Sequence, residues 1–162
     1  MIYEKTNIKV DLESLKQDFL INQNIWNRTK NRICLNNHDG IDDYKENAGQ
    51  RFIYTEYKYM NTAFKNTIWE ETLNLIPNKI ARARVMIMKY ESVLNIHRDI
   101  ECRWHLALFT DPACVFYDYE SNTTFHIPAD GYFYRIDTRR LHTTFNATSN
   151  FDRVHLVVNE YV

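Results

Sequence analysis

Four residues in the second half of the chain have types and spacing that suit metal chemistry. His97 and Asp99 form an H-x-D pair, His142 follows far downstream, and Arg153 lies eleven residues after His142. Residues two apart on an extended backbone point to the same face, so one short segment can present an imidazole beside a carboxylate. Two histidines and one carboxylate can hold a divalent transition metal and leave its other positions open. The planar fork of an arginine suits a dicarboxylate ligand.

The H-x-D pair alone is a weak signal, but later segments repeat its spacing. Arg103 and His105 stand two apart just after it, and so do Arg153 and His155 near the end of the chain. Each pair therefore shares one face of an expected strand. An arginine that faces inward needs a partner, because an unpaired buried charge costs several kcal/mol. These pairs favour a polar interior that holds a metal and an anionic ligand.

The same residues could also have purely structural roles. Asp99 could begin a turn, and Arg153 could form a surface ion pair that contributes little stability. Cys102 and His105 differ in parity, so they point to opposite faces of one strand, which disfavours a closed tetrahedral zinc site. The agreement between spacing and strand placement favours the metal site. Two histidines with one carboxylate is the ligand set of non-haem Fe(II) oxygenases.

Composition and charge argue against several classes of partner. The chain of 162 residues has 20 Lys or Arg and 21 Asp or Glu, a formal net charge of −1. The charges are spread along the sequence, without a basic stripe or tail. The N-terminus does not read as a signal peptide, and no apolar run approaches the about 20 residues that span a bilayer. We therefore expect a soluble, cytoplasmic protein without nucleic-acid or membrane partners; its oligomeric state stays open.

The length predicts a single domain over residues 1–162. We divide it into a helical and loop part at 1–79 and a jelly-roll metal-binding core at 80–162. Three cysteines without C-x-x-C spacing indicate neither a disulfide framework nor a zinc knuckle.

The N-terminal part contains signals for two helices and a loop. Asp11 is placed to cap the first helix. The run 61–76 has the apolar spacing of an amphipathic helix, and Pro77 follows it as a stop signal. Between the two, the polar stretch 36–50 predicts a loop that could cover a site.

After Lys79 the sequence changes to short segments rich in β-branched and aromatic residues. Polar or Pro-containing breaks separate them at intervals of roughly ten residues, which is typical of a sandwich or barrel, including jelly rolls. The segments are IARARVMIMKY, CRWHLALFT, ACVFYDYE, TTFHI, GYFYRID, LHTTFNA and RVHLVVNEYV. The pattern predicts an α+β fold with a jelly-roll core.

Four motifs follow one another in this half of the chain: HRDIECRWHLAL, the glycine of GYFYRID, LHTTFN and RVHLVV. Their order resembles the aspartyl/asparaginyl β-hydroxylase branch of the 2-oxoglutarate- and Fe(II)-dependent oxygenases, to which some free proline hydroxylases are similar. The match spans roughly residues 82 to 160. The resemblance implies a double-stranded β-helix (jelly-roll, cupin-like) core with the N-terminal helices packed outside.

The resemblance also implies cofactors, roles and an activity. His97 and His142 become Fe(II) ligands, Arg153 anchors the distal carboxylate of 2-oxoglutarate, and Arg103 with His105 lines the same pocket. The implied reaction hydroxylates an amino acid, free or within a peptide or protein. In it, 2-oxoglutarate and O2 are converted to succinate and CO2.

The chain departs from that family at two positions. Animal aspartyl hydroxylases lack a carboxylate ligand, whereas Asp99 here completes a metal-binding, catalytic triad with the two histidines. Met86 stands where those enzymes have a serine on the strand before the first histidine. Tyr90 and Ser92 are the candidates to replace that serine as a contact of 2-oxoglutarate.

Substrate recognition and two rival functions stay open. Arg103 is expected to orient a substrate carboxylate, or else it joins Arg153 on 2-oxoglutarate. One rival is a cupin-type jelly roll that binds a metal or ligand without 2-oxoglutarate chemistry. The other is a cupin-type isomerase or dioxygenase, which commonly uses three histidines and a glutamate. An inward Arg153 on the last strand favours the 2-oxoglutarate oxygenase over both.

Overall fold

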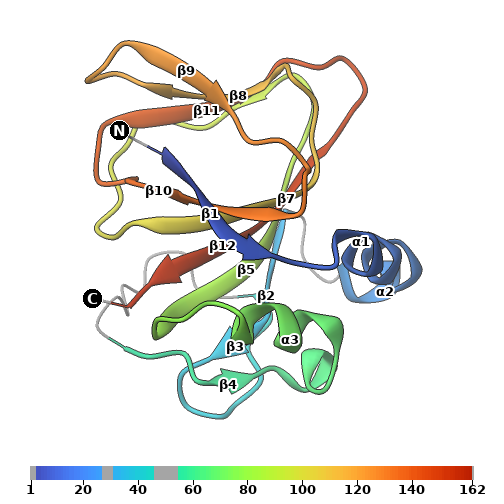
Figure 1. The fold of residues 1–162 in the computed structure, drawn as a ribbon. Helices are drawn as coiled ribbons and strands as arrows, with labels where there is room; N and C mark the ends of the chain where they lie inside the picture. The colour runs from blue at the N-terminus through green and yellow to red at the C-terminus, as the bar shows by residue number, and fades with distance from the viewer. Residues whose placement is uncertain (1–2, 27–30, 46–54, 162) are drawn as a thin grey trace.

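The computed structural model describes residues 3–26, 31–45 and 55–161. Two antiparallel sheets face each other, and the helices lie away from the smaller sheet (Figure 1). The large sheet contains, in spatial order, β1 (Tyr3–Lys9), β10 (Tyr132–Ile136), β7 (Arg103–Phe109), β12 (Arg153–Glu160), β5 (Ile80–Met88) and β2 (Arg32–Cys34). The small sheet contains β6 (Ser92–Val93), β11 (His142–Asn146), β8 (Cys114–Asp118) and β9 (Thr123–His126).

This arrangement confirms the predicted fold, a jelly-roll core with N-terminal helices packed outside. Each of the seven predicted strand segments forms a strand. The N-terminal part also supplies β1 and β2, which are the two edge strands of the large sheet. The remaining elements are α1 (Leu12–Ile21), α2 (Gln23–Trp26), β3 (Asn36–Asn37), β4 (Tyr59–Met60), a 3-10 helix (Thr62–Phe64) and α3 (Ile68–Asn74).

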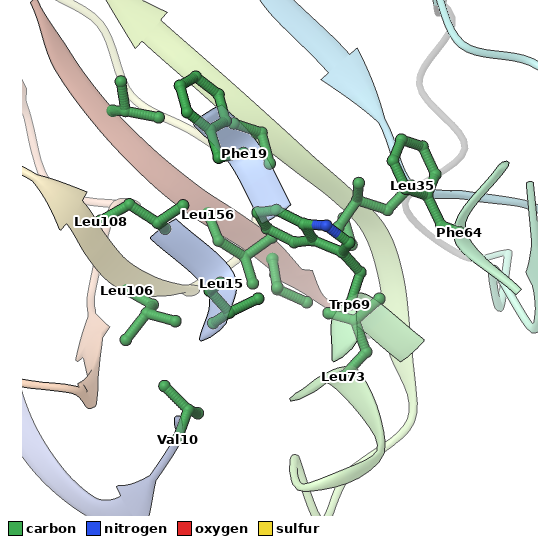
Figure 2. Close-up of a cluster of buried hydrophobic side chains, with 14 of the residues drawn as sticks. Val10, Leu15, Phe19, Leu35, Phe64, Trp69, Leu73, Leu106, Leu108 and Leu156 are labelled. Carbon is green, nitrogen blue, oxygen red and sulfur yellow. The ribbon is translucent and has the colours of Figure 1, made fainter. Parts of the chain in front are cut away.

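One face of the large sheet is apolar and packs against the helices. Figure 2 shows Leu106, Leu108 and Leu156 of the sheet grouped with Leu15 of α1 and Trp69 of α3. All five side chains are completely removed from solvent. Burial of one such side chain contributes about 1.5–3 kcal/mol, so this cluster holds the helices on the sheet.

The opposite face of the large sheet looks toward the small sheet and carries polar side chains beside an apolar cluster that includes Ala107, Tyr134 and Ile136. Side chains alternate along a strand, so the neighbours of Leu106 and Leu156 point away from the helices. These neighbours include His105 and His155, and both are buried. The space between the two sheets is therefore lined on its large-sheet side by buried polar groups next to an apolar cluster.

The predicted helix at 61–76 is wrong in extent. A 3-10 turn occupies its start, and Asn66 has a positive φ of 55° that breaks the run. Thr67 then caps α3, because its hydroxyl accepts a hydrogen bond from the backbone N–H of Trp69. Asn can adopt left-handed φ at low cost, which apolar spacing alone does not reveal. The predicted cap at Asp11 is confirmed by its bond with the N–H of Ser14.

The polar stretch 36–50 is anchored at its start by a group of buried side chains, the asparagine cluster of Asn36, Asn37 and Asn61. Asn36 bonds the backbone of β5 through Ala81 and Ala83. Residues 46–50 lie outside the described part of the chain, so a covering role for this loop stays a prediction.

The three cysteines are buried and free of disulfide bonds. Across the described ranges, no helix combines the length and the apolar character needed to cross a membrane.

Candidate metal centre

The backbone itself joins the two predicted histidine ligands. His97 follows β6, and His142 begins β11. Each donates its backbone N–H to the carbonyl of the other at 3.0 Å, forming an isolated antiparallel bridge. Residues paired in this way point to the same side of the ladder, and the two rings are 4.5 Å apart between centroids.

The side chain of Asp99 completes the group. Its Oδ1 lies 3.9 Å from Nε2 of His97, and its Oδ2 lies 3.8 Å from Nε2 of His142. One ligand atom from each residue falls within 4.8 Å of the others. The predicted convergence within about 5 Å, which ligand bonds near 2 Å require, is therefore confirmed.

Hydrogen bonds fix both imidazoles in the tautomer that a metal needs. Nδ1 of His97 lies 2.6 Å from the carbonyl of Asn95, and Nδ1 of His142 lies 2.8 Å from the carbonyl of Arg140. A carbonyl only accepts, so each Nδ1 carries the hydrogen and each Nε2 keeps its lone pair. Burial lowers the pKa of His142, which favours the neutral ligand form.

One atom of the group shows that a cation fits here. Oδ2 of Asp99 is buried and has no hydrogen-bond partner among the described residues. A buried carboxylate oxygen without a donor is costly, and a metal ion between it and the two Nε2 atoms removes that cost. His97 is partly exposed, so the site opens to solvent on that side. Two imidazole nitrogens and one carboxylate oxygen suit Fe(II).

Arg153 lies inside the jelly roll, as predicted. Its guanidinium is 5.0 Å from the ring centroid of Phe116 in β8, the strand that pairs with His142's strand. Its nitrogens contact the sulfur of Met88 at 3.4 Å and Nδ1 of His155 at 3.2 Å. Within the described part of the chain, no carboxylate pairs with it. Burial lowers its pKa to about 10, so the group is still charged at neutral pH.

Two buried histidines beside Arg153 also have ring nitrogens without partners. Both ring nitrogens of His105 and Nε2 of His155 have no hydrogen bond to any described residue. The rings lie 5.9 Å apart, and that of His105 lies 5.3 Å from the ring of Phe116. Burial, and then the charge of Arg153, lowers the pKa of both histidines well below the usual range. A buried cation beside neutral imidazoles that have unsatisfied ring nitrogens is suited to an anionic ligand.

Arg103 is not grouped with Arg153 but bonds a metal-site residue. Its Nη2 donates to Oδ1 of Asp99 at 2.6 Å, and its Nε lies 3.7 Å from Oε1 of Glu101. The expected contact of Arg103 with a substrate or with 2-oxoglutarate stays a prediction. Glu101 was not predicted from the sequence. Its spacing of two residues from both Asp99 and Arg103 would place it on their face of an extended backbone and could have indicated it.

A groove of about 720 Å³ opens next to Arg153. Met86, Met88, Ser92 and Leu94 contribute to its wall. Among the residues that the structure describes, the charged side chains that line it are all cationic: Arg32, Lys45, Lys89 and Arg153. Met86 and Ser92 both line this space, whereas Tyr90 is an exposed residue outside its lining.

No family model and no curated protein matches the chain. Among solved structures, a 2OG-Fe(II) oxygenase family oxidoreductase from Burkholderia pseudomallei is similar over 88% of this chain and 77% of that one. The two share 12% sequence identity, and the TM-score is 0.48. A likeness of this size carries no information on activity. The chain's own geometry defines a jelly-roll protein with a His-Asp-His group that fits a metal.

Proposed function

We propose that the protein is an Fe(II)- and 2-oxoglutarate-dependent dioxygenase that hydroxylates an amino acid, free or within a peptide or protein. His97, Asp99 and His142 hold the metal. The observation that carries the proposal is the arrangement of their donor atoms. Two Nε2 lone pairs, fixed by carbonyls on the far side of each ring, face a carboxylate whose buried Oδ2 has no other described partner.

The buried guanidinium of Arg153 supports 2-oxoglutarate as the second ligand. This cosubstrate has a carboxylate at each end, so one can reach the metal while the other meets the arginine. A charge-assisted bidentate pair removes the cost of a buried cation whose described contacts include no carboxylate. The neutral rings of His105 and His155 can add hydrogen bonds without adding charge.

The chemistry divides between the bound groups and the chain. Fe(II) with 2-oxoglutarate and O2 supplies the hydroxylation, in which the substrate C–H becomes C–OH and the cosubstrate leaves as succinate and CO2. The chain holds the metal with three side chains and aligns the cosubstrate through Arg153. The buried ring of Phe116 lies over the guanidinium of Arg153 and keeps water from it.

The groove supports a substrate that carries negative charge. Its lining has no acidic side chain among the described residues, and Arg32, Lys45 and Lys89 stand along it. A carboxylate-bearing amino acid or peptide would be attracted to such a lining. The three groove cations line this space directly, whereas Arg103 is not part of its described lining.

Anaerobic calorimetry with Mn(II) in place of Fe(II) tests the assignment. The wild-type chain should bind 2-oxoglutarate only when Mn(II) is present. Arg153→Met should weaken 2-oxoglutarate binding on the order of a hundredfold and leave Mn(II) affinity unchanged. Arg135→Met is the matched control, because Arg135 pairs with Glu160 and lies on the other face of the large sheet.

Succinate release with Fe(II), measured over a panel of amino acids and acidic peptides, then identifies the substrate class. Mn(II) binding without any 2-oxoglutarate binding would indicate a cupin-type metal-binding module instead. Equal 2-oxoglutarate affinity in wild type and Arg153→Met would remove Arg153 from the site.

A further inference from the structure

We propose that Arg103 is a positioning residue for the metal, and that Glu101 and Asn159 fix it in place. The inference rests on the proposed metal site, and it assigns to Arg103 a task on the metal's own carboxylate. Arg103 begins β7, and its inward side chain is 16% exposed. It therefore acts on Asp99 from a largely buried position.

The contact between Arg103 and Asp99 gives the two carboxylate oxygens different roles. Oδ1 accepts a hydrogen bond from Nη2 of Arg103 at 2.6 Å. Oδ2 has no described donor and lies 3.8 Å from Nε2 of His142. The terminal torsion of an aspartate is broad, so a free carboxylate would rotate between many orientations. Arg103 holds it in the one that leaves Oδ2 open for the metal.

A guanidinium beside a divalent cation is repulsive unless another charge offsets it. Glu101 supplies that charge, since its Oε1 lies 3.7 Å from Nε of Arg103 and its side chain is 3% exposed. Asp99, Glu101 and Arg103 together carry one net negative charge. Glu101 thus lets Arg103 orient Asp99 without cancelling the attraction for a cation.

A second set of bonds fixes Glu101. Nδ2 of Asn159 donates to Oε1 of Glu101 at 2.5 Å, and Oδ1 of Asn159 accepts from Nη2 of Arg84 at 3.3 Å. The register of β12 on β7 places Asn159 opposite Arg103, which brings this amide to the acid. Glu101 and Asn159 are both buried. The support for Arg103 therefore comes from β12, the neighbour of β7 in the sheet.

The backbone around the two acids is held as well. The N–H of Asp99 donates to the carbonyl of Thr138 at 2.9 Å, and the hydroxyl of Thr138 donates to the carbonyl of Glu101 at 2.6 Å. One residue of the β10–β11 connection thus clamps both ends of the segment. The carboxylates are prearranged before any metal binds, which is what a supporting layer of contacts contributes to metal affinity.

Arg98 shows that nearness in sequence does not create this role. It stands between the ligands His97 and Asp99, yet its guanidinium bonds Glu120 and the carbonyl of Arg139. It is more than half exposed. Of these two arginines, only Arg103 touches the metal carboxylate.

The test is a titration of the chain with Mn(II) in the absence of 2-oxoglutarate. The EPR signal of the unbound ion measures how much Mn(II) is bound. Arg103→Met should weaken Mn(II) binding about tenfold or more, as loss of an outer partner of a metal ligand does. Arg103→Lys keeps a charged donor and should recover part of that loss. Glu101→Gln should also weaken binding, because it leaves Arg103 without its offsetting charge. Arg135→Met, which removes an Arg–Glu pair on the outer face, should bind like wild type.

Melting temperatures of the metal-free variants separate positioning from folding. If Arg103→Met does not fold, Arg103→Lys and Glu101→Gln carry the test. Wild-type or tighter Mn(II) binding by Arg103→Met overturns the inference. So does a variant that keeps Mn(II) affinity and loses only 2-oxoglutarate affinity, because Arg103 would then be a cosubstrate ligand.

The outcomes for the wild-type chain distinguish this inference from the proposed function. A chain that binds Mn(II) but neither binds nor consumes 2-oxoglutarate overturns only the proposed activity. A chain that binds no Mn(II) overturns both.

Discussion

Two groups of buried polar side chains differ in how completely the chain itself satisfies them. In the asparagine cluster, every amide nitrogen and oxygen of Asn36, Asn37 and Asn61 has a partner. The partners are backbone groups and the asparagines themselves. Inside the jelly roll, the described residues leave ring nitrogens of His105 and His155 without partners.

The difference separates a structural group from a binding group. An unsatisfied buried donor or acceptor costs about 1–3 kcal/mol, so folds normally satisfy them, as the asparagine cluster does. The interior between the sheets holds several such atoms together, beside the buried charge of Arg153. A bound metal and an anionic ligand would supply partners for these unsatisfied polar atoms and for the buried charge. Substitutions in the asparagine cluster should therefore lower stability and spare binding. Substitutions in the interior between the sheets should lower binding and spare stability.

The largest expected effect is on metal affinity. Asp99→Ala removes one of three ligands and should weaken Mn(II) binding by more than about a hundredfold, beyond what loss of an outer partner causes. The metal-free chain should keep its stability within about 1 kcal/mol, because Arg103 retains Glu101. Titration and urea unfolding measure the two quantities. Asp130→Ala, which removes an aspartate paired with Lys5, should leave Mn(II) affinity unchanged. Full affinity in Asp99→Ala would exclude Asp99 as a ligand.

Breaking the asparagine cluster should give the reverse pattern. Asn36→Ala removes hydrogen bonds to Tyr57, Ala81 and Ala83 and leaves their backbone groups buried. The free energy of unfolding should fall by about 3 kcal/mol. Mn(II) affinity should not change at a temperature where the variant is folded. Asn150→Ala, at an exposed position, should cost no more than about 0.5 kcal/mol. If the free energy of unfolding fell only slightly in Asn36→Ala, the cluster would not stabilise the fold.

A smaller effect of opposite sign is expected at Arg153. Without ligands, its buried charge has no described carboxylate partner, so Arg153→Met should raise the free energy of unfolding by about 1 kcal/mol. Arg135→Met should lower it by less than about 1 kcal/mol, because that arginine forms a partly exposed pair with Glu160. Urea unfolding of the ligand-free chains measures both. Destabilisation by Arg153→Met would show that the chain alone satisfies this arginine.

A separate prediction concerns the pH dependence of stability. Folding holds the pKa of His105 and His155 well below 6.5, through burial and then the charge of Arg153. The unfolded chain takes up protons near pH 6.5 and the folded chain does not. Stability is therefore complete above about pH 6.5 and falls below it, by at most about 1.4 kcal/mol per pH unit for each histidine.

Urea unfolding of the metal-free chain at pH 7.5 and pH 5.5 measures this fall. His105→Phe should make the fall shallower, because one proton-binding group is removed from the unfolded state. The asparagine cluster has no titratable side chain, so Asn36→Ala should keep the full pH dependence. An unchanged fall in His105→Phe would show that His105 is protonated in the folded chain.

The sequence by itself determined the features that depend on local period. Strands place alternate residues on one face, so the two-residue spacing in HRD, RWH and RVH was enough to predict which side chains share a face. The same alternation, with turn signals between segments, predicted the jelly roll and the inward direction of Arg153. A capping aspartate predicted the start of α1. These features need only a few consecutive residues.

Tertiary structure decided which of those faces meet and at what register. The bridge between His97 and His142 and the pairing of Asn159 with Arg103 join residues far apart in the sequence. A one-residue slip of either pairing would turn every side chain of the strand to the other face. No local pattern reports that register, so the sequence could not show that Arg103 bonds Asp99. Long-range strand pairing, set by how the whole core packs, fixes that contact.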